Sequence, residues 1–539
     1  MAATQASAFL QAVAPLMPRG SSQDSPAADV CTEKGAPSHS TTTSACVDVF
    51  FKFVRDLPEE NVHSMCEAAW NESPKDLLKL ILYTRDCEEG KGEKLLAYQA
   101  LVWLHNAHGA LLPRLLPLLA SDEVHFGYWK DLLTVTLEVK KASGWNREAL
   151  RASPVFQKVV ELFAERLTSD LELLGSDESR VSLCGKWAPT PKCHHDKRAG
   201  FVDAIAKRMF PGEHAYRSKY SKALHQLRQR AEVPELCFSE KRFGELDFER
   251  MPGLCLKRHR KAFERNCPEH WAKYTEALAA GKADIKVKML YPYEIVQPYL
   301  SASGTATVDD VVEAQWRKKV EEVRASGALA ARRIMPICDV SGSMTCDDLR
   351  PLLNSISLGL LIAEVADGPL ASHVFTFDTT PKLVHIDGET LLARAQQVLG
   401  MGWGGATNFA ETFRACLAFM KQNKVAVEEA PEVFLCISDM QFDAAAGSSW
   451  GQTNFDHIAG LYREAGYPMP TLWFWNVRGS TPDFPVLADQ PGVAMVSGYS
   501  PSVLKLLLEG SEPTPYLVMR QALASPRYDG VDALCLEEE

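Results

Sequence analysis

Five oxygen-bearing side chains occur in this sequence at positions that could hold one hard metal ion. Asp339, Ser341 and Ser343 alternate in a short loop that directly follows an apolar run. Two further donors, Thr407 and Asp439, follow a glycine turn and a second apolar run. Divalent cations such as Mg²⁺ and Mn²⁺ prefer oxygen ligands, so the spacing predicts a Mg²⁺ or Mn²⁺ site. The alternative is that the serines only cap a following helix and the aspartates are surface acids.

The elements that must position these donors alternate between short apolar runs and helical patterns from Arg333 onward. Strands are predicted at 333–338, 372–377, 382–386, 432–437, 471–476 and 493–496. Helices are predicted at 348–366, 389–398, 408–422, 454–465 and 502–508. This alternation is typical of a mostly parallel sheet covered by helices on both faces. The donor loops then fall at or beside the carboxyl ends of strands, where open α/β sheets bind ligands.

The preceding part of the chain is predicted to be entirely helical. Amphipathic stripes occur at 74–82, 95–105, 111–119, 129–139, 155–174 and 311–323. Successive short helices of this kind indicate a helical-repeat, HEAT-like solenoid, although no fixed sequence period is present. The predicted fold class is therefore α + α/β, with a Rossmann-like second domain.

Four regions follow from these patterns. We expect a disordered tail over 1–46, a helical-repeat domain over 47–325, a metal-binding α/β domain over 326–515 and a C-terminal tail over 516–539. A disordered tail is favoured over a transit peptide at the start, because residues 18–45 are rich in Ser, Thr, Pro and Ala.

Composition restricts the class of protein. The chain has 539 residues, of which 46% are hydrophobic and 24% charged, an ordinary balance for a soluble globular protein. No apolar run approaches the roughly 20 residues of a membrane span, so we expect no membrane association. The 14 scattered cysteines indicate reduced thiols and an intracellular, cytoplasmic location. The group Cys184, Cys193, His194 and His195 has a spacing that fits no common zinc module.

Charge is distributed unevenly along the chain. Residues 333–539 hold 12 basic and 25 acidic side chains, whereas 186–265, here called the basic block, holds 19 basic and 10 acidic ones. Clustered cations are what phosphate contacts require, so the basic block is the candidate RNA-binding surface. The alternative is a solvated helical face. The candidate RNA-binding residues are Lys197, Arg198, Arg217, Lys219, Lys222, Lys257, Arg258, Arg260 and Lys261.

The five donors resemble the metal-ion-dependent adhesion site of von Willebrand factor A domains, whose motif is Asp-x-Ser-x-Ser, a distant Thr and a distant Asp. The resemblance implies that Ser341, Ser343 and Thr407 bind Mg²⁺ directly, while Asp339 and Asp439 hold bound waters. It also implies that an acidic residue of a protein ligand could complete the metal shell.

Longer strings resemble a family known only as domain of unknown function 2828. They begin at Tyr83-Thr84-Arg85-Asp86-Cys87, Gly90-Lys91-Gly92-Glu93, Gly185-Lys186-Trp187-Ala188-Pro189 and His195-Asp196, and they continue at Tyr291-Pro292-Tyr293-Glu294-Ile295-Val296, Ser438-Asp439-Met440-Gln441-Phe442 and Phe474-Trp475-Asn476-Val477-Arg478-Gly479. A helical solenoid followed by an A domain is also similar to the Ro ribonucleoprotein (TROVE) family. That similarity implies a protein that binds structured RNA.

These observations predict a non-catalytic binding scaffold whose leading ligand is RNA. The alternative is a metal-dependent protein-interaction module without RNA. A catalytic function is disfavoured, because the sequence shows no recognisable Ser-His-Asp or Cys-His set. The glycine-rich run around Lys91 lacks the spacing of a Walker phosphate loop and follows a helix rather than a strand.

Overall fold

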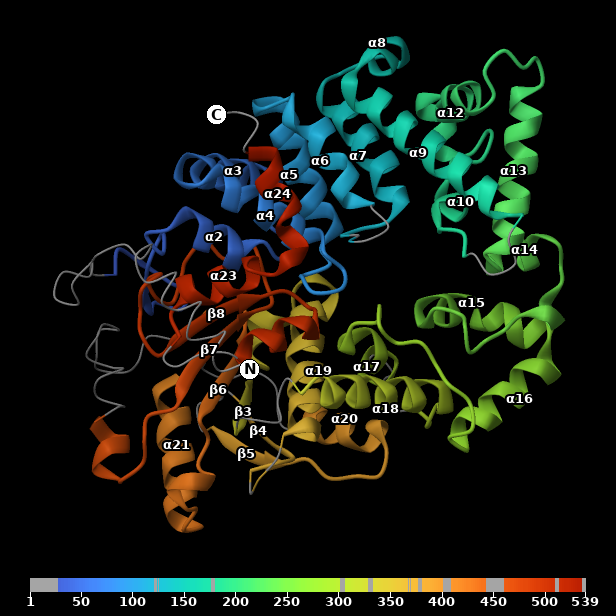
Figure 1. Cartoon of the computed structure of the whole chain (residues 1–539). Coiled ribbons are helices and arrows are strands. Elements are labelled where there is room, and N and C mark those ends of the chain that lie inside the picture. The colour runs from blue at the N-terminus through green and yellow to red at the C-terminus, as the bar shows by residue number, and fades with distance from the viewer. Residues whose placement is uncertain are drawn as a thin grey trace. The chain divides into compact units, whose positions relative to one another are not determined.

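The protein combines many helices with one main sheet in a computed structural model (Figure 1). The structure describes residues 28–120, 124, 126–175, 180–300, 306–327, 333–366, 368, 370–376, 381–400, 409–442, 460–508 and 513–535. These residues form two compact units. A helical unit comprises 59–70, 74–275 and 525–539, and a sheet unit comprises 1–58, 71–73 and 276–524.

The helical unit is built from consecutive helices joined by short loops. They are α3 (Glu59–Glu72), α4 (Pro74–Arg85), α5 (Lys94–Ala107), α6 (Leu111–Leu119), α7 (Trp129–Ala142), α8 (Arg147–Ala152), α9 (Pro154–Leu173), α10 (Cys184–Trp187), α11 (His194–Ala199), α12 (Phe201–Met209), α13 (Tyr216–Arg230), α14 (Pro234–Ser239), α15 (Gly253–Asn266), α16 (Pro268–Ala279) and α24 (Gly530–Cys535). Helix α9 packs against α12, and α12 packs against α13.

Local sequence explains where the longest of these helices begins and what it buries. Ser153 precedes α9, and its hydroxyl accepts the Phe156 N–H at 3.2 Å. Pro154 follows at the first helical position, where its missing N–H has no partner to lose. The helix then buries an apolar stripe that includes Val159, Phe163 and Leu167.

The sheet unit contains a six-stranded sheet and the helices beside it. The elements are β1 (Val30–Cys31), β2 (Pro37–Ser38), α2 (Ala45–Lys52), α17 (Pro292–Leu300), α18 (Asp310–Ala325), β3 (Ile334–Cys338), α19 (Arg350–Val365), β4 (His373–Thr376), β5 (Lys382–His385), α20 (Leu391–Leu399), α21 (Phe409–Gln422), β6 (Val433–Ser438), β7 (Thr471–Asn476), β8 (Val493–Ser497) and α23 (Pro515–Leu523). The main sheet has the order β5-β4-β3-β6-β7-β8. All its pairs are parallel except β4–β5.

The central strands are apolar because helices cover them. Every residue of β3 and of β6 is buried, as expected for parallel strands with both faces covered. Helix α19 lies against β3 and β6. Gly359 permits this close approach, since a Cβ at that position would stand 2.1 Å from the Cys338 sulfur.

The unit boundaries differ from the predicted domains. Residues 28–58 and 276–325 belong to the sheet unit, where α2 packs against β8 and α17 packs against α19. Residues 516–535, predicted to be a tail, include α23 and α24 instead. Helix α23 packs against β8, and α24 packs against α4 and α6. The correction has a physical reason: these segments carry apolar side chains, such as Val518 and Val531, that are buried in the units they join.

The predicted elements agree closely with the structure. All six predicted strands are present, and the predicted helices that the structure describes throughout are present too, with 502–508 forming a 3-10 helix (Pro501–Leu508). The predicted helix at 454–465 lies partly outside the described residues. In the part of the chain that the structure describes, no helix is both long and apolar enough to cross a membrane.

Candidate functional site

Asp339 and Asp439 lie at the carboxyl ends of the two neighbouring central strands. Asp339 follows β3 directly, and Asp439 follows β6. The strands pair in parallel with Cys338 opposite Ile437, and the Asp339 N–H donates to the Ile437 carbonyl at 3.0 Å. The strand order reverses between β3 and β6, because β4 and β5 lie on one side while β7 and β8 lie on the other. Open parallel sheets bind ligands at such a point.

The Asp339 carboxylate is held by two hydrogen bonds. Its Oδ1 accepts the Ser341 N–H at 2.9 Å, and its Oδ2 accepts the Ser438 hydroxyl at 2.5 Å. The side chain is fully buried. Both oxygens are therefore fixed in orientation by neutral hydrogen-bond donors.

The Asp439 carboxylate is also fully buried, and it interacts electrostatically with Arg478 and with the buried Lys52. Its Oδ1 accepts the Gln441 N–H at 3.2 Å. Its Oδ2 lies 3.5 Å from Nη1 of Arg478, which follows β7. That distance is long for a charge-assisted hydrogen bond, so the arginine offsets only part of the negative charge of the two carboxylates.

Burial and the nearby Asp439 carboxylate disfavour ionisation of Asp339. Burial and, to a smaller extent, the negative charge of Asp439 raise the pKa of Asp339 to about 6, against the opposing effect of the hydrogen bonds from Ser438 and Ser341. A cation between the two groups would remove this penalty. The electrostatics of the site thus favour a bound positive charge.

The serine hydroxyls complete a donor set that fits a hard divalent ion. Oγ of Ser341 lies 3.1 Å from Oγ of Ser343. Adjacent ligands in an octahedral Mg²⁺ shell at about 2.1 Å from the metal are roughly 3.0 Å apart, so both hydroxyls could bind one ion. Ser341 is buried and Ser343 is half-buried. Thr407, the fifth predicted ligand, lies outside the described residues.

The alternative reading of these residues as caps and surface acids does not hold. Ser341 stands at the N-cap of a short 3-10 helix (Gly342–Thr345), yet its side chain makes no capping hydrogen bond. Asp339 and Asp439 are both fully buried rather than exposed. Helix capping therefore does not explain why the fold brings Asp339, Ser341, Ser343 and Asp439 together.

Two polar residues at the same strand ends were not singled out from the sequence. Ser438 binds Asp339, as described above. Asn476, at the end of β7, is fully buried and pairs with Ser438 across the sheet. Its Oδ1 accepts the Arg478 N–H at 2.9 Å, while its Nδ2 has no hydrogen-bond acceptor in the described protein. Ser438 and Asn476 share one sequence signal that could have identified them, a polar residue at the end of an apolar strand.

The cysteine and histidine group considered for zinc lies elsewhere. His194 and His195 begin α11 with ring centroids 5.0 Å apart, whereas Cys184 is fully buried in α10. Among the described residues, no three His, Cys, Asp or Glu side chains gather as a metal-binding group. The candidate metal centre at β3 and β6 uses hydroxyls alongside its two acids.

The first five predicted RNA-binding residues lie on two helices of the helical unit. Lys197 and Arg198 are exposed at the end of α11, and Lys222 is exposed on α13. Arg217 and Lys219 are already engaged, at 2.8 Å from Asp203 and 2.6 Å from Glu213. The sequence predicted their position on the surface but not their acidic partners.

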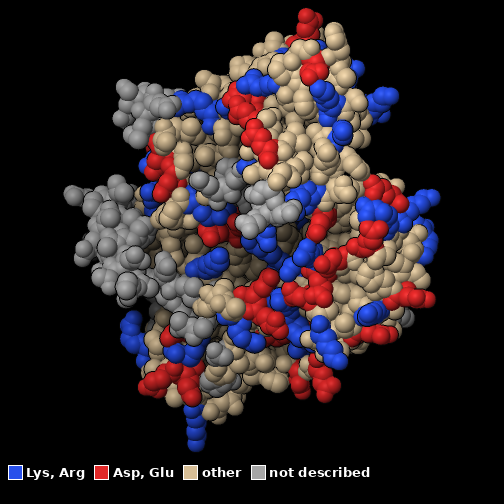
Figure 2. Space-filling model, turned by 45° about the vertical axis from the view of Figure 1, so that its right-hand side comes forward, with Lys and Arg blue, Asp and Glu red and all other residues tan. Residues whose placement is uncertain are grey.

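The other four predicted RNA-binding residues lie on α15. Arg258 and Lys261 are exposed, and Lys257 is half-buried. Arg260 forms an ion pair with Glu264 one helical turn later, at 2.8 Å. Figure 2 shows acidic side chains interspersed among basic ones on the face it presents. The basic block is thus a mixed surface in which some cations are committed to local pairs.

Comparisons with known proteins place the chain in a family. A family model described as a domain of unknown function, DUF2828, matches residues 32–150 and 147–329, more than half of the chain. A second model, also described as a domain of unknown function, DUF7788, matches residues 333–518. The chain belongs to the DUF2828 family, which confirms that part of the resemblance.

A viral relative supports the same assignment over nearly the whole length. "Uncharacterized protein L728" of Acanthamoeba polyphaga mimivirus is 30% identical to this chain over 512 residues, which are 91% of this chain and 86% of that protein. The match includes both units, so the helical and sheet parts occur together in the relative. Neither the family descriptions nor this name states an activity.

Proposed function

We propose that this protein is a non-catalytic binding scaffold with a divalent-metal site in its sheet unit and an RNA-binding surface on its helical unit. The observation that carries the proposal is the site at β3 and β6. Two fully buried carboxylates and two serine hydroxyls 3.1 Å apart converge there, at the reversal of strand order.

The topology supports the finer assignment of the sheet unit to the von Willebrand A type. Numbered along the chain from β3, the sheet has the order 3-2-1-4-5-6, that of a doubly wound fold, with one antiparallel edge strand. The successive helices of the other unit support the HEAT-like solenoid. An A-type domain joined to helical repeats is also similar in architecture to the Ro ribonucleoprotein family. This similarity favours RNA as a ligand by analogy.

In this proposal each member of the metal site has a distinct role. Ser341, Ser343 and Thr407 bind Mg²⁺ or Mn²⁺ through their hydroxyls. Asp339 and Asp439 orient bound waters and supply negative charge. The observed partners of the two carboxylates are hydroxyl, amide and guanidinium groups. These contacts hold the two carboxylates in fixed orientations, which suits them to orienting metal-bound waters.

The metal half of the proposal is tested with Asp439→Asn. Wild-type protein should bind Mg²⁺ in titration calorimetry and melt at a higher temperature in its presence. Asp439→Asn should lose both effects. Asp489→Asn, which changes an exposed acid of the same unit, is the matched control and should behave as wild type. Equal Mg²⁺ affinity in all three proteins would refute the site.

The RNA half is tested by binding of single-stranded RNA to the full chain at low salt. RNA binding that survives Asp439→Asn would locate the RNA surface away from the metal. If wild-type protein binds no RNA, the alternative takes precedence: a metal-dependent module that recognises an acidic residue of a protein partner. The half-buried Ser343 leaves that alternative sterically open.

A further inference from the structure

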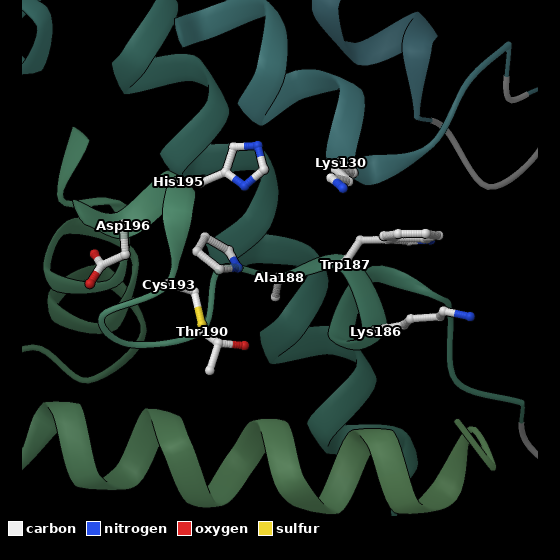
Figure 3. Close-up of a pocket in the computed structure, with 9 residues that line it drawn as sticks. Lys130, Lys186, Trp187, Ala188, Thr190, Cys193, His195 and Asp196 are labelled. Carbon is white, nitrogen blue, oxygen red and sulfur yellow. The ribbon is translucent and has the colours of Figure 1, made fainter. Parts of the chain in front are cut away.

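The helical unit contains a small cavity that the metal site and the predicted basic residues do not explain. It opens between Lys130 at the start of α7, the loop after α10 and the first residues of α11 (Figure 3). Its volume is about 160 Å³, below the roughly 300–1,000 Å³ of pockets for drug-sized ligands. The cavity therefore suits a small ligand, or one unit of a longer one, rather than a large cofactor.

The wall of the cavity is held rigid by α13. Arg228 donates from its guanidinium to the carbonyls of Gly185 and Ala188 at 3.0 and 3.1 Å and to the Thr190 hydroxyl at 3.0 Å. The Tyr220 hydroxyl donates to the Pro189 carbonyl at 2.8 Å. The loop Gly185–Thr190 is thus fixed along its length, which lowers the entropy cost of binding a ligand.

Glycine is required where this loop meets α13. A Cβ at Gly185 would stand 2.9 Å from Cβ of Leu227. A larger residue at position 185 would therefore displace the backbone of the adjacent residues Lys186 and Trp187. The strings Gly185–Pro189 and His195-Asp196, which carry part of the family resemblance, both contribute to this cavity.

Trp187 supplies a flat ring beside two cations. Nζ of Lys186 lies 5.2 Å from the ring centroid, and Nζ of Lys130 lies 6.0 Å from it. The centroid of the Tyr128 ring lies 5.7 Å from the centroid of the Trp187 ring. The indole Nε1 is buried and has no acceptor in the described protein. A ligand with a flat ring and hydrogen-bond acceptors would satisfy this arrangement.

The lining favours a negatively charged ligand. Figure 3 shows Asp196 pointing away from Trp187 and Lys130, and its carboxylate accepts the N–H groups of Lys192 and Val202, each at 3.0 Å. Lys186 forms an ion pair with Glu235 at 3.4 Å. The Glu235 side chain is half exposed, so solvent screens this pair. Lys130 is exposed and adds a second positive charge at the cavity.

His195 does not add to this charge at neutral pH. Burial, together with the positive charges of His194, Lys130 and Arg198, lowers the pKa of His195 to about 4. The ring is therefore a neutral polar group that can donate or accept one hydrogen bond. The cavity thus combines a fixed wall, an indole face, a neutral imidazole and two ammonium groups.

We propose that this cavity binds one unpaired nucleotide, with the base against Trp187 and the phosphate at Lys130 and Lys186. Stacking on an aromatic ring and neutralisation of the phosphate are the two interactions by which proteins hold single-stranded nucleic acid. The inference rests on the proposed RNA-binding function and specifies where a strand is held. A free nucleotide has the same chemistry, so the test must separate the two sources.

The test measures binding of uridine monophosphate and of an eight-nucleotide oligouridylate to the full-length protein by calorimetry and fluorescence anisotropy. Trp187→Ala should weaken both by roughly 10- to 100-fold, and Trp187→Phe should restore most of the loss because it retains an aromatic face. Lys130→Gln should make the plot of log affinity against log salt shallower by roughly 0.7. Lys421→Gln, an exposed lysine of α21 in the sheet unit, is the charge-matched control and should change nothing.

The outcomes separate this inference from the proposed function. Oligouridylate binding that is equally tight in wild type, Trp187→Ala and Lys130→Gln would overturn the cavity as the site while leaving RNA binding intact. Binding of the monophosphate alone, lost in Trp187→Ala, would support the cavity as a free-nucleotide site and overturn RNA as its ligand. No binding of either probe by folded wild-type protein would overturn both.

Discussion

The Thr32 hydroxyl donates a hydrogen bond of 2.8 Å to the carbonyl of Phe442, 410 positions later in the chain. The next residue reaches the same loop, since the Glu33 N–H donates to Gln441 Oε1 at 2.7 Å. Ser38 similarly donates to Asp483 Oδ2 at 2.8 Å. The segment around Thr32 is therefore bound to the loop that carries Asp439, and it is an integral part of the sheet unit.

Thr32→Val should destabilise the protein by about 1–3 kcal/mol, because it removes a buried hydrogen bond to the Phe442 carbonyl. Urea denaturation followed by circular dichroism measures the change. Thr134→Val is the matched control, since the Thr134 hydroxyl bonds to the Lys130 carbonyl in a solvent-exposed position. Equal losses for the two variants would show that the Thr32 contact contributes no more than a surface hydrogen bond.

Arg85→Ala should destabilise the helical unit by about 3–5 kcal/mol, because it leaves the Asp131 carboxylate charged and buried. Arg85 Nε donates to Asp131 Oδ2 at 2.8 Å, and the Tyr98 hydroxyl donates to Oδ1 at 2.5 Å. The arginine side chain is 1% exposed and the aspartate 4%. Thermal and urea unfolding measure the loss.

The control for this variant is Arg217→Ala, which breaks an ion pair with Asp203 whose arginine is 68% exposed. Solvent and salt screen exposed ion pairs, so this control should change stability little. A larger loss in Arg217→Ala than in Arg85→Ala would contradict the stabilising role of the buried Arg85–Asp131 pair.

Lys91 should make the stability of the helical unit increase with pH. Burial lowers the pKa of Lys91 to about 7 from 10.5, although Glu93 acts in the opposite direction. Between these values the unfolded chain binds a proton at this side chain that the folded chain does not. The contribution of Lys91 to the free energy of unfolding therefore rises from about pH 7 to about pH 10.5.

Comparison of wild type with Lys91→Met measures this contribution. Between about pH 7 and pH 10, wild type should gain at least about 1 kcal/mol relative to the variant in urea denaturation. Lys273→Met, at an exposed position of α16, should show no such relative gain. A constant difference between wild type and Lys91→Met across this range would mean that Lys91 titrates as an ordinary lysine.

Replacement of Lys257, Arg258, Arg260 and Lys261 with Gln should weaken RNA binding and make its salt dependence shallower. Each lost phosphate contact on a single strand reduces the slope of log affinity against log salt by roughly 0.7. The loss should be similar for unrelated RNA sequences, since phosphate contacts do not specify bases. Filter binding across a salt series is the measurement.

Ser341→Ala is the control for the RNA measurement, because it alters the candidate metal site without changing surface charge. It should leave the slope unchanged. A quadruple variant that matches wild type at every salt concentration would identify this part of α15 as a solvated face, in keeping with the Arg260–Glu264 ion pair.

Local sequence was sufficient to predict most elements of the chain. The strand predicted at 432–437 is β6 at Val433–Ser438, and the helix predicted at 155–174 is α9 at Pro154–Leu173. Helices and strands are marked by residues that are close together in the sequence, so an apolar run or a helical stripe is enough to predict them. The same reasoning predicted Asp339 and Asp439 at strand ends, where the structure places both of them.

The sequence by itself thus determined the order and type of most elements and the positions of the candidate metal-site donors along the chain. Only the tertiary structure decided which distant segments meet: Thr32 with Phe442, Asp86 with Arg527, and Lys130 with Trp187. The physical reason is that burial and buried hydrogen bonds depend on packing between elements, which no local pattern records. The cavity beside Trp187 exists only because α7, α10 and α11 converge there.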